Sequence, residues 1–317
     1  MEYIARENVI EKIRPYIGNS LIKILIGQRR VGKSYVLYQL MDELSLNSSP
    51  QIVYINKEDF KYDDIRTYAD LINYVQSVVE PLKKVALFID EIQEIASFEK
   101  ALRHFQSQKT YDIYCTGSNS NMLSGELATL LAGRYIQIPI YSLSYSEYLI
   151  FHQKNDSTES LIEYLKFGGM PHLINLHYNE EVYYEYLRNV FNTIVLKDIV
   201  ARYSIRNVPF LQDLIRFLAN NLGSIVSAKR ISDFLKSQQI AVQSRSVQEY
   251  LYYLESVFFI ERVKRAEIEG RKIFEIGDKF YFEDVGMRNI FFHIMIEQSL
   301  VEINDRIRAC RQYCPIA

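Results

Sequence analysis

The stretch Gly27-Gln28-Arg29-Arg30-Val31-Gly32-Lys33-Ser34 fits the pattern G-x-x-x-x-G-K-[ST], in which a glycine-rich loop cradles phosphate groups. Glycine at positions 27 and 32 lets the backbone turn where a side chain would obstruct it, so that consecutive N–H groups point at phosphate oxygens. Lys33 is expected to reach the β- and γ-phosphates, and the hydroxyl of Ser34 is expected to bind Mg²⁺. All eight residues are therefore predicted to bind a nucleotide.

The residues on either side of this loop have the order that such a site needs. Residues 21 to 26 (LIKILI) predict a short buried strand before the loop. After the loop, apolar residues recur at helical spacing from Val36 to Leu44. A helix that starts at the loop adds the positive end of its dipole to the phosphate site. This context favours a phosphate-binding loop over an ordinary glycine turn.

Length and composition limit the classes of protein to consider. A chain of 317 residues, 48% hydrophobic and 24% charged, predicts a soluble globular protein of two or three domains. Lys and Arg number 37 against 39 Asp and Glu, so the whole molecule is not an electrostatic binder of nucleic acid or membrane, although a local patch is compatible with this balance. With three cysteines, no secretory signal and no apolar run of roughly 18 residues, we expect a cytoplasmic protein without a membrane segment.

A second motif lies at residues 85 to 91 (VALFIDE), an apolar strand that ends in two carboxylates. In ATPases with a phosphate-binding loop this is the Walker B element, in which the Asp holds Mg²⁺ and the Glu polarises the attacking water. We therefore predict that Asp90 binds the metal together with Ser34, and that Glu91 is the general base. The two motifs together predict ATP and Mg²⁺ as cofactors.

A third segment offers polar side chains for the γ-phosphate. The strand predicted over residues 111 to 116 leads into Gly117-Ser118-Asn119-Ser120. Ser118 or Asn119 would sense the γ-phosphate or orient water there, with Thr116 ranked below them. The alternative is a glycine turn whose Ser and Asn cap the next helix.

Arg134 precedes the last predicted strand, over residues 136 to 140. It would pair with the γ-phosphate or with the acidic site, as arginine fingers do, and a surface cation at a strand edge fits the sequence equally well. The repeated strand and helix units predict an α/β fold of the P-loop NTPase type, a parallel sheet flanked by helices. Its ligand should lie at the carboxyl ends of the strands.

Beyond residue 141 the pattern changes from strands to helices. Helices are predicted over residues 144–152, 158–167 and 180–203, with a glycine and proline break between the last two. The His residues in this part lack the spacing of a metal site. We expect a helical subdomain here.

Three more predicted helices are followed by two β-like runs, which is the order of a winged helix. Between residues 224 and 275 there are nine Lys or Arg and seven Asp or Glu, and the third helix carries Arg245 as its one basic residue. Because DNA readers usually have a stronger basic face, the partner of this domain is left open between double-stranded DNA and a protein. The predicted division is a P-loop ATPase domain (1–141), a helical subdomain (142–205), a winged-helix domain (206–285) and a C-terminal tail (286–317).

Several motifs, in this order, resemble those of the prokaryotic AAA-type P-loop ATPases (AAA_14-like) that carry a DUF4143 region after the ATPase domain. The resemblance covers roughly residues 1 to 290. The motifs that carry it are Gly27 to Ser34, Leu87-Phe88-Ile89-Asp90-Glu91-Ile92-Gln93, Thr116-Gly117-Ser118, Ala132-Gly133-Arg134-Tyr135, Gly168-Gly169-Met170-Pro171, Lys197-Asp198-Ile199-Val200-Ala201-Arg202-Tyr203 and Lys279-Phe280-Tyr281-Phe282-Glu283-Asp284-Val285-Gly286.

The resemblance implies an ATPase core in which the two Walker strands are separated by one other strand, then a winged-helix segment, with ATP and Mg²⁺ as ligands. It does not imply a substrate beyond ATP. Relatives of this type continue into a restriction-endonuclease-like region, and nothing after Asn289 resembles that region. We therefore expect a shortened form without a nuclease-like role.

These observations favour an ATP-binding and ATP-hydrolysing switch protein that couples its nucleotide state to a winged-helix domain. One alternative is a DNA-binding regulator in which the ATP site is structural. Another is a P-loop phosphotransferase, although such kinases usually lack a Glu after the Asp of the second motif. The sequence leaves open whether Arg134 or Arg202 acts at the γ-phosphate, whether it acts in its own chain or in a neighbouring one, and whether the chain forms oligomers.

Overall fold

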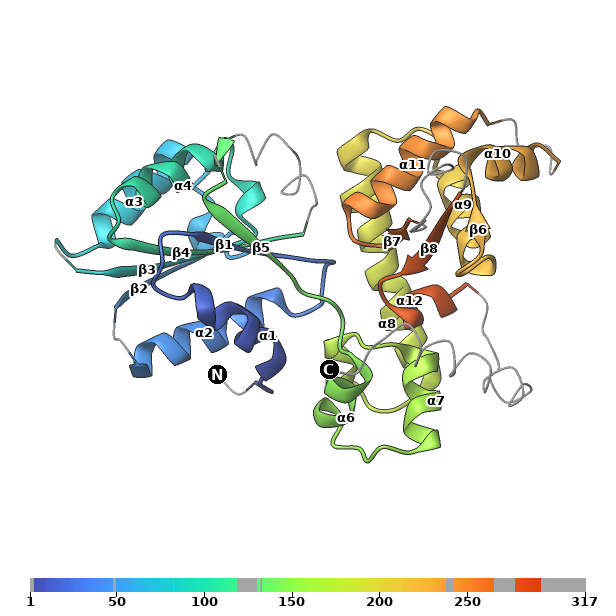
Figure 1. Cartoon of the computed structure of the whole chain (residues 1–317), viewed down its shortest axis with the longest axis horizontal. Helices are drawn as coiled ribbons and strands as arrows, with labels where there is room; N and C mark the ends of the chain where they lie inside the picture. The colour runs from blue at the N-terminus through green and yellow to red at the C-terminus, as the bar shows by residue number, and fades with distance from the viewer. Residues whose placement is uncertain are drawn as a thin grey trace, which may run out of the picture.

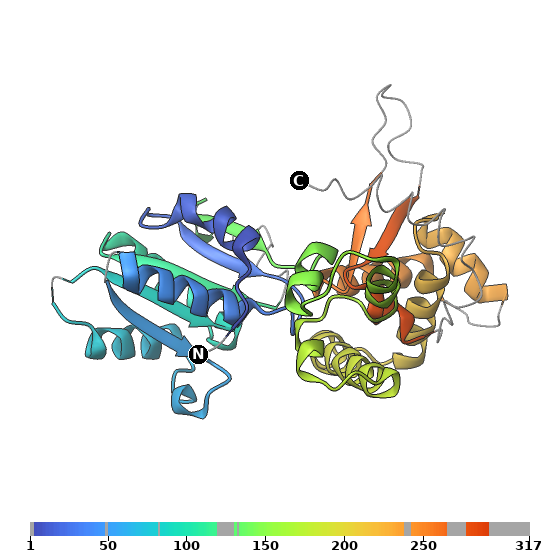
Figure 2. The same ribbon diagram turned by 90° about the horizontal axis from the view of Figure 1, so that it is seen from below.

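The structure is a computed structural model, which describes residues 3–47, 50–81, 83–118, 130–131, 133–237, 242–264 and 277–291. The described chain forms two lobes that lie side by side (Figure 1). The first lobe is built around a parallel sheet, and the second is helical with a small antiparallel sheet. Figure 2 shows the same two lobes from below, joined through a narrower middle.

The first lobe confirms the predicted α/β fold. Its five strands are parallel and lie in the order β2-β3-β4-β1-β5. The strands that lead into the glycine-rich loop and into the two carboxylates, β1 and β3, are separated by β4, as the resemblance implied. Their bounds are β1 (Ile22–Ile26), β2 (Gln51–Asn56), β3 (Val85–Asp90), β4 (Tyr111–Gly117) and β5 (Tyr135–Pro139).

Helices cover both faces of this sheet. They are α1 (Glu7–Ile13), η1 (Arg14–Tyr16), α2 (Lys33–Asn47), η2 (Phe60–Tyr62), α3 (Tyr68–Val78), η3 (Ile92–Glu94) and α4 (Phe98–Ser107). Successive strand residues point to opposite faces, so that Leu25 and Phe88 pack with α1 and α2, whereas Ile24 and Leu87 pack with α3 and α4 (Figure 1). Because both faces are covered, every residue of β1 and β3 is buried, and all of them except Lys23 and Asp90 are apolar.

The start of α3 is fixed by the residues at its N-terminus. The helix begins after Thr67. Thr67 and Asp70 form a capping box there, in which each side chain accepts a hydrogen bond from the backbone N–H of the other residue. This pair satisfies the free N–H groups of the first turn and so fixes where the helix starts.

The second lobe begins with the predicted helical stretch. Its elements are α6 (Tyr145–Phe151), α7 (Thr158–Phe167), η5 (Pro171–Asn175), α8 (Glu180–Thr193) and the π-helix η6 (Ile194–Ala201). The prediction of one continuous helix over residues 180–203 is therefore correct in length, but its second half is a π-helix and not an α-helix. A π-helix has wider turns than an α-helix, which changes the direction of its side chains relative to a 3.6-residue period.

The rest of the lobe is a group of helices with a three-stranded antiparallel sheet in the order β6-β8-β7. The short strand β6 was not predicted from the sequence. It pairs with β8, and the pair β7 and β8 stands out in orange and red in Figure 2. The elements are α9 (Val208–Asn220), β6 (Ile225–Val226), α10 (Ala228–Ser237), α11 (Ser244–Ser256), β7 (Ile260–Val263), β8 (Asp278–Phe282) and α12 (Val285–Asn289).

Two of the motifs quoted above, Gly168 to Pro171 and Lys279 to Gly286, contact each other and so join the beginning of the second lobe to its end. The carboxylate of Asp284 caps α12 by accepting a hydrogen bond from the Met287 N–H (3.0 Å), and it accepts another from the Gly169 N–H (2.7 Å). A Cβ atom on Gly168 would collide with this carboxylate, and one on Gly169 would collide with the carbonyl oxygen of Leu143. The glycines are therefore required for close packing.

Two sequence predictions fall on residues outside the described part. They are the end of the first β-like run with the start of the second, and most of the C-terminal tail, of which residues 286 to 291 belong to α12 and the residues next to it; Asn119 also lies outside the described residues. Among the described residues, no helix combines the length and the apolar character needed to cross a membrane.

Candidate nucleotide-binding site

The glycine-rich loop connects β1 to α2, as its pattern predicts. Gly32 has φ of 92°, a left-handed conformation that glycine adopts without strain. Gly27 is required for a different reason, because a Cβ atom there would collide with the carbonyl oxygen of Ile140, where the chain leaves β5. Sequence reasoning assigned both glycines to the path of the loop, but it did not identify the contact with Ile140.

Lys33 is buried at the start of α2. Its ammonium donates hydrogen bonds to the carbonyl oxygens of Gly27 (3.0 Å) and Gln28 (2.9 Å). Burial lowers the pKa of the Lys33 ammonium, while the negative charges of Glu91 and Asp90 act in the opposite direction. Among the described residues, no carboxylate lies within ion-pair distance of this ammonium. A buried cation without an ion pair suits an anionic ligand.

The side chain of Gln28 adds a buried group without hydrogen-bond partners in the described part of the chain. It is only 1% exposed, and neither its amide nitrogen nor its amide oxygen has a hydrogen-bond partner in the described part of the chain. Buried polar atoms of this kind are uncommon in folded proteins and are often satisfied by a ligand or by water. Together with Lys33, this orphaned amide fits the binding of a polar, anionic group at the loop.

Asp90 ends β3 beside the loop, and its carboxylate is held on both oxygens. The Thr116 hydroxyl, from β4, donates to Oδ1, and the Tyr54 hydroxyl, from β2, lies 3.3 Å from Oδ2. Thr116 Oγ also accepts a hydrogen bond from the Glu91 N–H (2.9 Å). Thr116, which we had ranked below its neighbours, is therefore the residue that connects the two carboxylate positions.

Glu91 has a left-handed backbone conformation with φ of 54°, which is uncommon for a residue other than glycine. Its carboxylate accepts hydrogen bonds from the Ser118 hydroxyl (2.7 Å, to Oε1) and from the Gln93 amide. Burial acts to raise the pKa of Glu91, but the charge of Lys33 and the hydrogen bonds from Ser118 and Gln93 outweigh it, so the pKa is lowered. Glu91 is thus a buried, oriented and ionised carboxylate.

The donor set also suits Mg²⁺. The described residues contain no group of three or more His, Cys, Asp or Glu side chains that could hold a metal by themselves. Mg²⁺ in nucleotide sites typically uses one or two protein ligands and completes its shell with phosphates and water. Asp90, next to the loop, and the half-buried Ser34, directly after Lys33, are the residues available for this role.

Two further residues were predicted for this site. Asn119 lies outside the described residues. Arg134 lies at the amino end of β5, where its carbonyl accepts a hydrogen bond from the Ile22 N–H (3.0 Å) at the start of β1. Since the loop follows the opposite end of β1, Arg134 lies away from the loop of its own chain, so the alternatives that remain from the sequence are a surface cation and a contact with the site of a neighbouring chain. Its guanidinium is instead 3.3 Å from the side-chain oxygen of Gln106.

Arg202, the other arginine left open by the sequence, follows the π-helix η6. Its Nη1 is buried and lacks a hydrogen-bond partner in the part of the chain that the structure describes. It lies four residues after Asp198, which contacts the loop through Arg29. Of the two candidates, Arg202 is therefore the one that belongs to a segment in contact with the loop.

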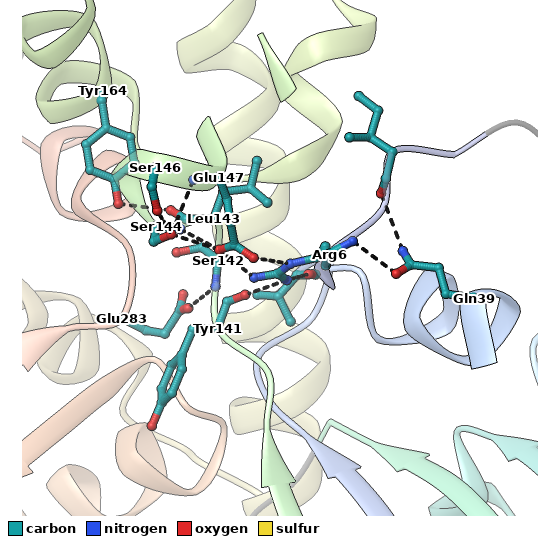
Figure 3. A network of polar contacts seen from close by, with 12 residues as sticks. Arg6, Gln39, Tyr141, Ser142, Leu143, Ser144, Ser146, Glu147, Tyr164 and Glu283 are labelled. Atoms are coloured by element: carbon teal, nitrogen blue, oxygen red, sulfur yellow. Dashed lines mark hydrogen bonds and ion pairs between the residues drawn. The ribbon is translucent and has the colours of Figure 1, made fainter. Parts of the chain in front are cut away.

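A buried arginine near the N-terminus, which sequence reasoning missed, connects the loop to the second lobe (Figure 3). The Arg6 guanidinium donates to the carbonyl oxygens of Val31 in the loop (3.1 Å) and Tyr141 after β5 (3.0 Å). It also donates two hydrogen bonds, of 2.9 and 3.0 Å, to the carboxylate of Glu147 in α6. The sequence signal for Arg6 is weak: it is a positive charge directly before an apolar helix.

Comparisons with known proteins identify two regions of the chain. Residues 19–149 match an AAA domain (AAA_14), and residues 158–298 match a domain of unknown function, DUF8612. The second match replaces the DUF4143 region that the resemblance had implied. A Walker-type ATPase of Pyrococcus abyssi has the same fold, with a TM-score of 0.64 at 16% identity, covering 91% of this chain and 95% of the other.

Two relatives are similar in sequence. An uncharacterized protein of Methanocaldococcus jannaschii is 31% identical over 251 residues, which are 75% of this chain and 55% of the relative. An uncharacterized protein of Haemophilus influenzae is 35% identical over 294 residues, which are 90% of this chain and 72% of the relative. This chain therefore belongs to the family of the Haemophilus protein, and it combines an AAA domain of the P-loop ATPase type with a domain of unknown function.

Proposed function

We propose that the protein binds ATP with Mg²⁺, hydrolyses it, and uses the nucleotide state to control its second lobe. The observation that carries this proposal is the buried carboxylate of Glu91, which accepts a hydrogen bond from Ser118 and lies close enough to the buried ammonium of Lys33 for their charges to interact. A P-loop with an adjacent oriented base has what phosphoryl transfer to water needs: charge stabilisation and a group that accepts a proton.

Each residue has a separate role in this mechanism. Lys33 and the N–H groups of residues 27–34 bind the phosphates, and Ser34 and Asp90 hold the Mg²⁺, which neutralises charge on the phosphate oxygens. Glu91 accepts a proton from the attacking water through its carboxylate. Ser118 keeps that carboxylate aimed and charged, and Asn119 is the second candidate for contact with the γ-phosphate.

The contacts of Arg6 support the coupling part of the proposal. This single guanidinium joins the loop at Val31, the connection between the lobes at Tyr141, and α6 at Glu147. A shift of the loop on nucleotide binding would change all of these hydrogen bonds together. We propose that nucleotide binding moves the helical subdomain (142–205) through the contacts of Arg6, and that this subdomain in turn moves the domain at residues 206–285.

We propose that residues 206–285 form a winged helix. The order α9, β6, α10, α11, β7, β8 and the antiparallel sheet are those of that fold. The exposed side of α11 carries Arg245, Gln248 and Tyr252, but Arg245 is paired with Glu249 at 3.3 Å. Because this balance does not favour phosphate backbones, we propose a protein partner; salt-dependent binding of duplex DNA that is lost in Arg245→Ala would contradict this choice.

The proposed activity is tested by measuring ATP binding calorimetrically in the presence of Mg²⁺ and the release of inorganic phosphate without any added acceptor. We expect wild-type protein to do both, and Lys33→Ala to lose both. Lys12→Ala, which removes an exposed lysine of α1, is the matched control and should behave as wild type. Phosphate release only in the presence of a small-molecule acceptor would indicate a phosphotransferase instead.

A further inference from the structure

Arg29, the third residue of the glycine-rich loop, points its side chain at the second lobe rather than into the loop. Its Nε donates to Oδ2 of Asp198 at 2.7 Å, and its Nη2 donates to Oδ1 of the same carboxylate at 3.0 Å. This is a bidentate pair between residues 169 positions apart in the chain. The side chains are only 11% and 3% exposed, so water screens their attraction little.

Asp198 contacts the loop from a π-helical stretch. It belongs to the π-helix η6, which continues α8 and is followed by Arg202. Isolated π-helical turns often occur at functional sites, where they direct a side chain that a regular α-helix would point elsewhere. Arg29 also feels the negative charges of Glu91 and of Glu58, and Glu58, 3.4 Å away after β2 and 63% exposed, contributes less than Asp198.

The Arg29–Asp198 pair lies within electrostatic reach of the catalytic cluster. The positive charge of Arg29 acts to lower the pKa of both Glu91 and Lys33, whereas the negative charge of Asp198 acts to raise the pKa of Lys33, although burial is the largest influence on each. A phosphate chain bound at Lys33 would therefore attract the guanidinium of Arg29 and repel the carboxylate of Asp198. A guanidinium can bind either a carboxylate or a phosphate in the same bidentate geometry.

We propose that Arg29 binds the phosphates of ATP. In the nucleotide-free protein its guanidinium binds the carboxylate of Asp198 instead, and bound ATP replaces that carboxylate with phosphate oxygens. The exchange frees η6 from the loop, so the π-helix moves only when the site is filled. This inference rests on the proposed ATP binding and names the contact through which ATP acts on the second lobe.

The exchange has a consequence that can be measured. Coupling between two contacts is reciprocal. A change that weakens the Arg29–Asp198 pair must therefore increase the affinity for ATP, because bound ATP weakens the same pair. Removing the charge of Asp198 should then increase ATP affinity, although the residue lies in the other lobe. A purely structural ion pair would give the opposite result, since its loss would disturb the loop.

The test is a calorimetric titration of the full chain with a nonhydrolysable ATP analogue and Mg²⁺. We expect Asp198→Asn to bind about 5-fold more tightly than wild type, and Arg29→Gln to bind about 10-fold more weakly, within the range usual for coupled sites. In Arg29→Gln/Asp198→Asn the second substitution should increase the affinity less than Asp198→Asn does alone. Asp213→Asn, which removes an exposed partner of Arg216 on α9, is the control and should leave the affinity unchanged.

A second measurement needs no variant. Hydrogen exchange of the wild-type backbone amides in η6 should become faster when the analogue is added. Unchanged or weaker binding by Asp198→Asn, or slower exchange in η6, would overturn the inference while leaving ATP binding by the wild type intact. Failure of the wild type to bind the analogue at all would instead overturn the proposed function and this inference with it.

Discussion

The guanidinium of Arg6 forms a buried, bidentate ion pair with the carboxylate of Glu147, 141 residues away in the chain (Figure 3). Glu147 also forms the capping box of α6 with Ser144, so the same carboxylate fixes the start of a helix and the position of the N-terminal segment. Through its bond to the Val31 carbonyl, Arg6 ties both to the glycine-rich loop. One side chain thus joins the two lobes at the nucleotide site.

Breaking this pair should destabilise the protein strongly. Arg6→Ala leaves the Glu147 carboxylate buried without its counter-charge, and such losses cost about 3 kcal/mol of unfolding free energy. The measurement is urea unfolding of the full chain followed by circular dichroism. Arg14→Ala, which removes an exposed arginine paired with Glu43, is the matched control and should have a much smaller effect. An equal loss of stability in both variants would contradict the account.

The stabilisation from Glu147 should depend on pH. Burial acts to raise the pKa of this carboxyl, but the hydrogen bonds and charge of Arg6, together with Ser144, lower it below its ordinary value of 4.5. A lowered pKa means that the stabilisation is complete above about pH 4.5 and is lost as the pH falls through the folded-state value. The difference in unfolding free energy between wild type and Glu147→Gln should therefore shrink below pH 4.5, and a difference that grows there would be inconsistent with the ion pair.

Ser118→Ala should move the acidic limb of the ATPase pH profile to higher pH. The hydrogen bond from Ser118 is one of the influences that lower the pKa of Glu91, so its loss raises that pKa, and the base becomes protonated at a higher pH. The profile of kcat/KM against pH measures this directly. Ser107→Ala, on α4, removes a hydroxyl that bonds to the local backbone and should leave the profile in place. A lower rate with an unmoved profile would mean that Ser118 does not act through Glu91.

Arg134→Ala should leave ATP turnover within about twofold of wild type at protein concentrations where the chain is monomeric. The reason is its position at the amino end of β5, opposite to the loop. Steady-state phosphate release, with the oligomeric state checked by light scattering, gives the answer. A loss of tenfold or more in the monomer would show that this placement of Arg134 relative to the site is wrong.

Much of the first lobe could be predicted from the sequence because its signals are local. The motif from Gly27 to Ser34 requires a strand before it and a helix after it, and an apolar run that ends in Asp90 and Glu91 marks the second strand of the site. Parallel strands place their carboxyl ends at the same edge of the sheet. For this reason Ser118 could be assigned from the sequence to the same cluster as Asp90 and Glu91.

The parts that could not be predicted depend on contacts between distant residues. Nothing near Arg6 in the sequence indicates Glu147, and nothing near Arg29 indicates Asp198, because each pair forms only when the lobes pack. The π-helix escaped prediction because its apolar residues also fit a 3.6-residue period. The sequence left open whether Arg134 contacts a phosphate, and its place just before a strand puts it at the edge of the sheet opposite to the ligand site of its own chain.

The central claim, that this site hydrolyses ATP with Glu91 as the base, is tested most directly by Glu91→Gln. We expect the variant to bind a nonhydrolysable ATP analogue with wild-type affinity and to release phosphate about 100-fold more slowly, the lower end of what a general base contributes. Glu94→Gln, three residues along on the exposed side of η3, should hydrolyse ATP normally. Wild-type rates of phosphate release from Glu91→Gln would contradict the claim.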